Sequence, residues 1–466
     1  MQNRSKYLAK NTGILSISSF SSKILIFFLV PIYTSVLSTA EYGSFDLITS
    51  TLQLIMPIVT CNIYEGVMRF AMEKSVDKKQ VASIGIKYIA LGTGILGFFI
   101  IINNILDIWQ IFIENSLLIF LYFFSNVLNQ YLIQLTKGLE KVRDMAIAGV
   151  LSTIVTVSLN IIFLLYLKLG LQGFYLSYII GFFISALFLM LRIRYHQYLS
   201  YKIDKSLEKE MTHYSAPLIM NSLGWWANNA SDRYVVTWLC GIAVNGVYSV
   251  SYKVPSIFAA IQQIFIQAWQ ISAVKEHNAE DSKRFYGRAL DSLNYITCLL
   301  CMLLILFVKV IATILFQKDF FEAWVYVPFL LVSGVFNSAS GILGPVLTAN
   351  MNAKAMGISA LIGSLSNIVL NIILVIPLGA QGAAIATAIS SFIIYECRKW
   401  FSKELVDFVK YPRMLFSWTL IICQAILMIY THKYWLQVLM IFLLCIIYLD
   451  TLKDIIRIGK EIASRK

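Results

Sequence analysis

A row of polar residues interrupts an apolar stretch near residue 50, and its spacing is helical. The row consists of Asp46, Ser50, Gln53, Pro57, Thr60 and Tyr64, separated by steps of three or four residues. Such steps place all six residues on one face of an α-helix. Because a charged group at the centre of a membrane helix costs about 2.5–3.5 kcal/mol on insertion scales, we expect this face to line an aqueous space and to bind a polar ligand.

Two further polar faces follow later in the chain. One carries Lys253, Ser256, Ala260, Gln263, Gln267 and Gln270, and the other carries Asn221, Trp225, Asn228 and Asp232, with Arg233 beside it. The first of these faces repeats the row near residue 50 at an offset of 203 residues, which pairs Lys253 with Ser50 and Gln267 with Tyr64. The repetition predicts that the three faces line one central cavity.

The cations available to this cavity are Lys23, Arg69, Arg233 and Lys253. Clustered cations in a medium of low dielectric constant favour an anionic ligand, particularly a pyrophosphate. The alternative is internal pairing, of Arg233 with Asp232 or Asp46 and of Arg69 with Glu65. Trp225 could stack on a sugar ring, although tryptophans also fill helix bundles and line membrane interfaces.

Motifs for catalysis and metal binding are missing from the sequence. It contains neither a phosphate-binding G-x-x-x-x-G-K-[ST] loop nor an H-E-x-x-H zinc motif. Cys298 and Cys301 form a C-x-x-C inside an apolar run, which favours a role as small core residues. We therefore expect no catalytic residues, no metal and no cofactor.

The residues must be positioned by membrane helices, because 58% of the chain is hydrophobic and only 14% is charged. A membrane span needs about 20 mostly apolar residues, and about fourteen such stretches occur. Their approximate limits are 12–37, 44–64, 81–105, 110–135, 143–167, 171–191, 213–239, 243–270, 289–316, 322–348, 355–377, 381–398, 413–430 and 434–451. The sequence thus predicts an all-α polytopic membrane protein, since only helices or closed barrels span lipid.

The net charge of +13 supports this organisation. About thirty lysines and arginines fall at the N-terminus, in every second loop and in the C-terminal tail, whereas the opposite loops hold about four. This bias predicts that both termini lie in the cytoplasm. It also explains the positive charge without nucleic acid.

An internal repeat predicts two lobes. Leu159-Asn160-Ile161-Ile162 precedes Leu169-Gly170-Leu171-Gln172-Gly173, and about 210 residues later Leu370-Asn371-Ile372-Ile373 precedes Leu378-Gly379-Ala380-Gln381-Gly382. Six spans in each half give a pseudo-twofold axis along the membrane normal. We expect an N-lobe over residues 1–200, a C-lobe over 201–400, and two appended helices with a basic cytoplasmic tail over 401–466.

The N-terminal region resembles a known family. Phe28-Leu29-Val30-Pro31-Ile32-Tyr33-Thr34, Glu41-Tyr42-Gly43 and Gly66-Val67-Met68-Arg69-Phe70 resemble segments of Wzx-type oligosaccharide flippases, which belong to the multidrug/oligosaccharidyl-lipid/polysaccharide exporter superfamily. The resemblance implies a transporter that moves undecaprenyl-pyrophosphate-linked oligosaccharide from the inner to the outer leaflet by alternating access. It also implies a cationic central cavity, and partners among the glycan polymerase and glycosyltransferases of the same pathway.

Three other functions stay open. A cation-coupled drug antiporter of the superfamily would favour an excess of intramembrane carboxylates over cations. A peptidoglycan-precursor flippase is a close relative, with similar chemistry. A membrane glycan polymerase is disfavoured because the expected long outer loop is missing.

Overall fold

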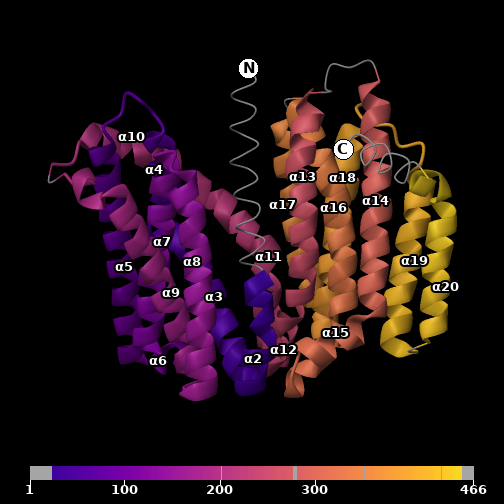
Figure 1. Ribbon diagram of the computed structural model, residues 1–466, viewed down its shortest axis with the longest axis horizontal. Helices are drawn as coiled ribbons and strands as arrows, with labels where there is room; N and C mark the ends of the chain where they lie inside the picture. The colour runs from indigo at the N-terminus through magenta and orange to yellow at the C-terminus, as the bar shows by residue number, and fades with distance from the viewer. Residues whose placement is uncertain (1–23, 201, 276–280, 351, 432, 454–466) are drawn as a thin grey trace, which may run out of the picture. The chain divides into compact units, whose positions relative to one another are not determined.

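The computed structural model describes residues 24–200, 202–275, 281–350, 352–431 and 433–453, and all its regular elements are helices (Figure 1). The chain divides into two compact units, an N-terminal unit up to Ala230 and a C-terminal unit from Ser231. The helix α11 contributes residues to both. The lobe limits expected at residues 200 and 400 stay predictions.

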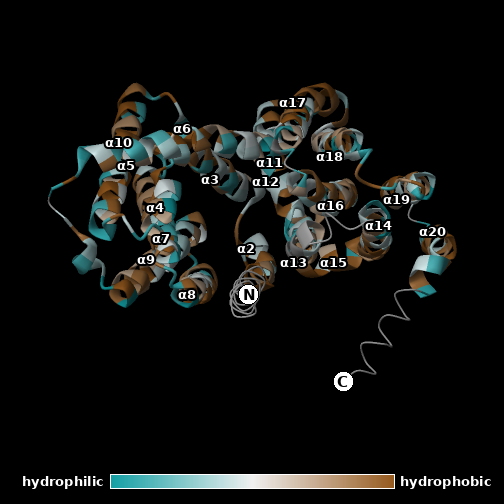
Figure 2. Ribbon diagram, turned by 90° about the horizontal axis from the view of Figure 1, so that it is seen from above, coloured by the Kyte–Doolittle hydropathy of each residue, from teal (hydrophilic) through white to brown (hydrophobic). Residues whose placement is uncertain are grey.

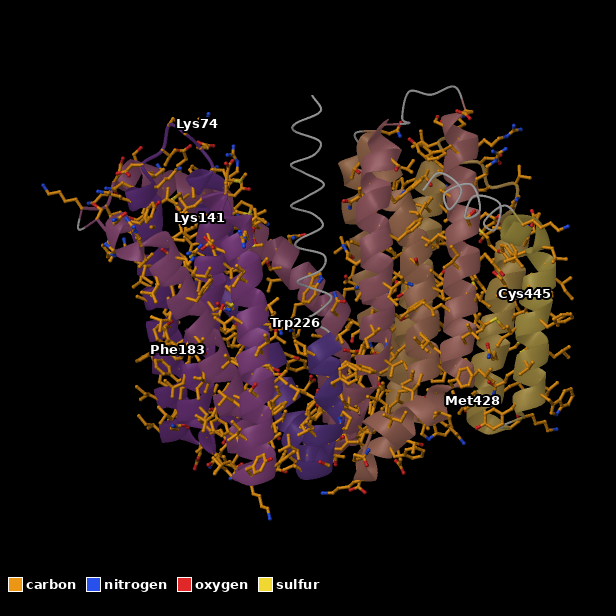
Figure 3. All side chains as sticks on the ribbon, viewed as in Figure 1. Lys74, Lys141, Phe183, Trp226, Met428 and Cys445 are labelled. Atoms are coloured by element: carbon orange, nitrogen blue, oxygen red, sulfur yellow. The ribbon has the colours of Figure 1, made fainter. Side chains whose placement is uncertain are left out.

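The N-terminal unit is a bundle of long helices joined by short ones. Its elements are α2 (Val30–Val36), α3 (Thr39–Val59), α4 (Ile63–Ala71), α5 (Lys78–Leu106), α6 (Gln110–Ile113), α7 (Ser116–Gly138), α8 (Val142–Asn160), a π-helix η1 (Ile161–Tyr166), α9 (Gly170–Ile193), a short 3₁₀ helix η2 (Tyr195–Tyr198), α10 (Lys205–Ser215) and the first part of α11 (Leu218–Cys240). Lys74 and Lys141, from two of the loops expected in the cytoplasm, lie at the same end of this unit (Figure 3).

The C-terminal unit surrounds one deeply buried helix. Its elements are the end of α11, α12 (Ile242–Ser251), α13 (Lys253–Lys275), α14 (Ser282–Leu306), α15 (Val308–Leu315), a 3₁₀ helix η3 (Lys318–Val325), α16 (Val327–Ala349), α17 (Ala353–Leu378), α18 (Ala380–Ser402), α19 (Tyr411–Tyr430) and α20 (Tyr434–Ile447). The helices α13, α14, α18 and α19 all contact α16, as the view from above shows (Figure 2).

Many helices are long and apolar enough to cross a membrane. Among the described residues, eight helices have the length and composition of a membrane span, and the number becomes nine if α3 and α4 form one bent span. The expectation of an all-α polytopic membrane protein is confirmed at this level. The finer count of about fourteen stays a prediction.

The repeated sequence motif places a glycine at a positive φ in both halves of the chain. Gly170 and Gly379 both adopt a left-handed backbone, with φ of +54° and +59°, which glycine tolerates best. The second glycine of each motif lies against backbone or side-chain atoms of the preceding helix. A Cβ at Gly173 would come within 2.9 Å of Phe163 Cβ, and one at Gly382 within 2.1 Å of the Leu374 carbonyl oxygen. Both contacts involve the residue three positions after the motif's asparagine.

The polar row near residue 50 does not lie on one continuous helix. The axes of α3 and α4 differ by 59°, and between them Cys61 and Asn62 both adopt left-handed backbones with φ of 50°. Pro57 lies one turn before this break, as expected for a bend in this span. The break interrupts the helical register after Thr60, so Tyr64 belongs to a separate helix from Asp46 and Gln53.

A buried ionic cluster attaches the last two helices to α14. Asp291, only 2% exposed, accepts hydrogen bonds from Arg413 on α19 and from Thr451 beyond α20. One turn deeper, Asn294 donates to Tyr448 Oη at 2.9 Å and accepts from Trp418 Nε1 at 2.7 Å. A buried polar or charged group without a partner destabilises the folded protein, so these contacts hold α19 and α20 as part of the C-terminal unit.

Candidate functional site

The polar face of α3 is partly covered by the start of α11. Trp226 on α11, labelled in Figure 3, donates its indole N–H to the Ser50 carbonyl oxygen at 2.8 Å. Ser50 is 1% exposed and Asp46 is half-buried, whereas Gln53, one turn further, is exposed. The α3 face therefore presents Gln53 rather than the whole predicted row.

The first part of α11 adds amides and an indole to this surface of the N-terminal unit. Asn221 is exposed, Asn228 is half-buried, and the Trp225 side chain is 62% exposed. The Trp226 hydrogen bond holds this part of α11 against α3, and a polar lining formed by Gln53 and Trp225 stays a prediction.

Arg69 lies on α4 and pairs with a different acid from the one considered in the sequence. Its guanidinium is 2.7 Å from Glu73 Oε1, and the side chain is 49% exposed. Glu65 instead accepts a hydrogen bond from Gln134 Nε2 on α7 at 2.9 Å. The suggested Arg69–Glu65 pair is therefore replaced by an exposed i,i+4 pair, whose energetic contribution is small.

Asp232 points into the C-terminal unit. It is 4% exposed and accepts hydrogen bonds from the hydroxyls of Tyr248 at 2.7 Å and Tyr252 at 2.5 Å. The neighbouring Arg233 is half-buried, and its guanidinium carbon lies 5.7 Å from the centre of the Tyr252 ring. The carboxylate and both phenols thus form a compact polar network beside the arginine.

Sequence reasoning missed a second group of buried amides, which Ser231, the residue before Asp232, contacts. Ser231 donates to Asn367 Oδ1 at 3.5 Å, and Asn367 donates to Ser390 on α18 at 3.1 Å. Asn371, one turn further along α17, donates to Asn367 Oδ1 at 2.9 Å. The repeated L-N-I-I motif contained the signal, because its asparagine is fully buried in both halves, as Asn160 and Asn371.

The α13 helix has a packing face and an exposed polar face. Gln262 donates to the Gly334 carbonyl at 3.1 Å and Trp269 to that of Ile342 at 3.0 Å, which fastens one side to α16. Gln263 and Gln270, two turns apart on the other side, are exposed, and Lys253 is half-buried. Gln263 and Gln270 of the predicted amide row are therefore exposed on the surface of α13.

Two predicted site residues are not covered by this description. Lys23 lies outside the described residues, and so does the side chain of Gln267. Within the described part of the chain, no group of three or more His, Cys, Asp or Glu residues is placed to hold a metal ion.

The surfaces described above share one chemical property. Each unit exposes amides, with Gln53 and Asn221 in one unit and Gln263 in the other. Arg69 is exposed, and Arg233 and Lys253 are half-buried. Polar side chains on membrane helices face protein or a water-filled cavity, because hydrocarbon offers them no hydrogen-bond partners. Such amide donors and acceptors suit sugar hydroxyls, and the cations suit phosphate oxygens.

Comparison with known families identifies the chain. The family model described as "Polysaccharide biosynthesis protein" matches residues 8–272, more than half of the sequence. The chain belongs to the polysaccharide biosynthesis protein family. The match begins before α2 and extends into α13, so it includes most of the polar residues described above. No protein of curated function matches the sequence significantly.

Solved structures place this family member in the MOP superfamily fold. The structure of the "Lipid II flippase MurJ" in an inward closed conformation is similar, with a TM-score of 0.72, 18% identity, and coverage of 95% of this chain and 98% of that one. An inward-facing multidrug resistance MATE family transporter has a TM-score of 0.69 and 15% identity, with coverage of 84% of this chain and 97% of that one. A MOP superfamily transporter from Pyrococcus furiosus has a TM-score of 0.58 and 15% identity, with coverage of 85% of this chain and 95% of that one.

These findings confirm the family suggested by the N-terminal segments. The solved structures that share this chain's fold are described as a multidrug resistance transporter and a lipid II flippase. Identities of 15–18% establish the fold alone, so the neighbours' substrates do not transfer to this chain.

Proposed function

We propose that this protein is a flippase for undecaprenyl-pyrophosphate-linked oligosaccharide repeat units, which it moves from the inner to the outer leaflet for surface polysaccharide synthesis. The observation that carries the proposal is the polysaccharide biosynthesis family match on a MOP transporter fold. The exposed amides of Gln53, Asn221 and Gln263 support it, because the cargo has sugar hydroxyls to hydrogen-bond. The predicted cations suit its pyrophosphate.

The proposed mechanism is alternating access between two lobes of six spans, with about fourteen spans in total and both termini in the cytoplasm. The pyrophosphate binds Lys23, Arg69, Arg233 and Lys253. The sugars bind Gln53, Asn221, Trp225, Asn228, Gln263 and Gln267, while the polyprenyl tail stays in lipid. Asp46 and Asp232 orient the neighbouring cations and phenols. The direction is set either by an ion gradient or by the use of the product by a glycan polymerase of the same pathway.

Single substitutions of the cavity cations test this assignment. We expect Arg233→Ala, and separately Lys253→Ala, to lower surface glycan at least tenfold in the native host, because each removes a positive charge from the pyrophosphate site. Surface glycan is measured by immunoblot, and protein abundance in the membrane is measured in parallel.

Arg284→Ala is the matched control, since Arg284 is an exposed arginine at the start of α14. It should leave glycan output unchanged. Normal output from both cavity variants at wild-type protein levels would contradict the cationic site. A gain of drug sensitivity on deletion, with normal glycan, would instead favour the antiporter.

A further inference from the structure

Arg398 joins three neighbouring helices of the C-terminal unit through neutral partners. It lies on α18, which packs against α16 and α17 (Figure 2). Its Nε donates to Ser359 Oγ on α17 at 3.3 Å, and its Nη1 donates to the Ser340 carbonyl oxygen on α16 at 2.9 Å. Among the described residues, no carboxylate oxygen lies within 4.0 Å of this guanidinium, and the nearby Glu396 pairs with Lys399 at 2.6 Å.

Most of the hydrogen-bonding capacity of Arg398 is therefore available to a ligand. A guanidinium has five N–H donors in a planar fork, and the two contacts described above occupy two of them. Partial withdrawal of this charge from water is unfavourable unless an anion compensates it. The side chain is half-buried rather than fully buried, so its remaining donors are open to an anion.

A buried hydroxyl on α16 faces the same side of the helix. Ser340 is 2% exposed, and its Oγ makes no hydrogen bond within the described part of the chain. Gly344, one turn further along, shares its helix face, and a Cβ on Gly344 would lie 3.5 Å from Arg398 Nη1. Because buried hydroxyls are nearly always hydrogen-bonded in proteins, this one and the guanidinium together suit a ligand with several acceptor oxygens.

This combination of donors fits a phosphate group. The planar fork of an arginine binds two phosphate oxygens through parallel N–H···O bonds, which a single ammonium does not provide. A serine hydroxyl donates one further hydrogen bond to a third oxygen. The site therefore recognises a phosphate ester or free phosphate, whose tetrahedral oxygens accept from both side chains at once.

The surroundings favour a lipid as the source of the phosphate. Arg398 lies four residues before the end of α18, a rise of about 6 Å, which puts it near the head groups rather than the membrane centre. The predicted topology places this end in the cytoplasm, and basic pockets between membrane helices on that side bind lipid head groups. On α17, Ile362, Leu365 and Val369 are 39%, 56% and 54% exposed and continue from Ser359 toward the membrane centre, beside an acyl chain.

We propose that Arg398 and Ser340 bind the phosphate of an anionic phospholipid of the inner leaflet. Free phosphate offers the same oxygens, and the experiment below separates the two sources. The site uses none of the cations assigned above to the transported pyrophosphate, so it goes beyond the proposed function and does not depend on it.

The test removes the buried hydroxyl without removing a hydrogen bond within the described structure. Ser340→Ala does this, and Ser338→Ala is the matched control. Ser338 is also buried on α16 and its Oγ also makes no hydrogen bond within the described residues, but it lies two positions away and faces another side of the helix. Arg398→Gln removes the charge together with two helix contacts, so Ser340→Ala is the cleaner variant.

Full-length variants in detergent are titrated with phosphatidylglycerol, followed by native mass spectrometry, and separately with inorganic phosphate, followed by calorimetry. We expect Ser340→Ala to weaken phosphatidylglycerol binding about tenfold, because one hydrogen bond to a charged group is lost. Arg398→Gln should weaken it further, and Ser338→Ala should leave it unchanged. The unfolding temperature of Ser340→Ala should equal or exceed that of the wild type.

Binding of inorganic phosphate alone, with the same dependence on Ser340 and Arg398, would support the phosphate site and assign it to free phosphate. Wild-type affinity for both ligands in Ser340→Ala and Arg398→Gln would overturn the proposal. Equal weakening in Ser338→Ala and Ser340→Ala would also overturn it, as would a wild-type protein that binds neither ligand. These outcomes leave the flippase proposal untouched, since it rests on other residues.

Discussion

At the scale of single residues, the sequence placed polar groups on helix faces but could not decide where each side chain points. Gln53 and Gln263 are exposed, and their role in binding a ligand stays a prediction, whereas Asp232 turns inward to Tyr248 and Tyr252. Helical spacing predicts the direction of a side chain only to within a broad arc around the helix, and contacts with other helices determine its orientation within that arc. Tyr248 lies on α12 and Tyr252 directly follows that helix, so no local pattern linked them to Asp232.

The repeated glycines give a prediction for one residue. Gly382→Ala should lower the free energy of unfolding by about 1–3 kcal/mol, because the new Cβ would lie 2.1 Å from the Leu374 carbonyl oxygen and the hairpin would have to open. Thermal unfolding of the purified protein in detergent measures the change. Gly357→Ala, with open space around its Cβ, should be neutral or slightly stabilising. Equal effects of the two substitutions would refute the close approach.

At the scale of elements, apolar run length located helices well, but interruptions within them were harder to place. The expected span 44–64 corresponds to α3 and the start of α4, and Pro57 indicated a bend. The break itself occurs at Cys61 and Asn62, through two left-handed residues that no rule of proline kinks specifies. The expected span 143–167 likewise matches α8 plus η1, but its apolar sequence gave no sign of a π-helix.

Because of the break between α3 and α4, substitution by glycine should change the unfolding temperature in opposite directions at Cys61 and at Cys423. Cys61→Gly should raise the unfolding temperature, since a left-handed backbone costs a non-glycine residue about 1–2 kcal/mol. Cys423→Gly, at a similarly half-buried position inside α19, should lower it, because glycine costs about 0.5–1 kcal/mol within a helix. Differential scanning fluorimetry of both variants checks this difference. A lower unfolding temperature in both would argue against the left-handed break.

At the scale of the whole molecule, composition and the recurrence of apolar spans were enough to predict a polytopic helical membrane protein. The repeated L-G-x-Q-G turn was visible because it depends on glycines whose local geometry allows little else. The attachment of α19 and α20 through Asp291 and Arg413 could not be predicted from the sequence. These two residues lie 122 positions apart, and each resembles a loop charge. Long-range pairing of this kind is set by packing, which a single sequence does not display.

Transport by the purified protein tests the account most directly. The full chain is reconstituted into proteoliposomes with undecaprenyl-pyrophosphate-linked oligosaccharide, and a membrane-impermeant glycosidase outside the vesicles reports how much glycan becomes accessible. The account predicts that cleavage rises from about half of the lipid in protein-free vesicles to nearly all of it, and that Arg233→Ala abolishes the increase. Cleavage that stays at the protein-free level with correctly folded wild-type protein would contradict the flippase assignment.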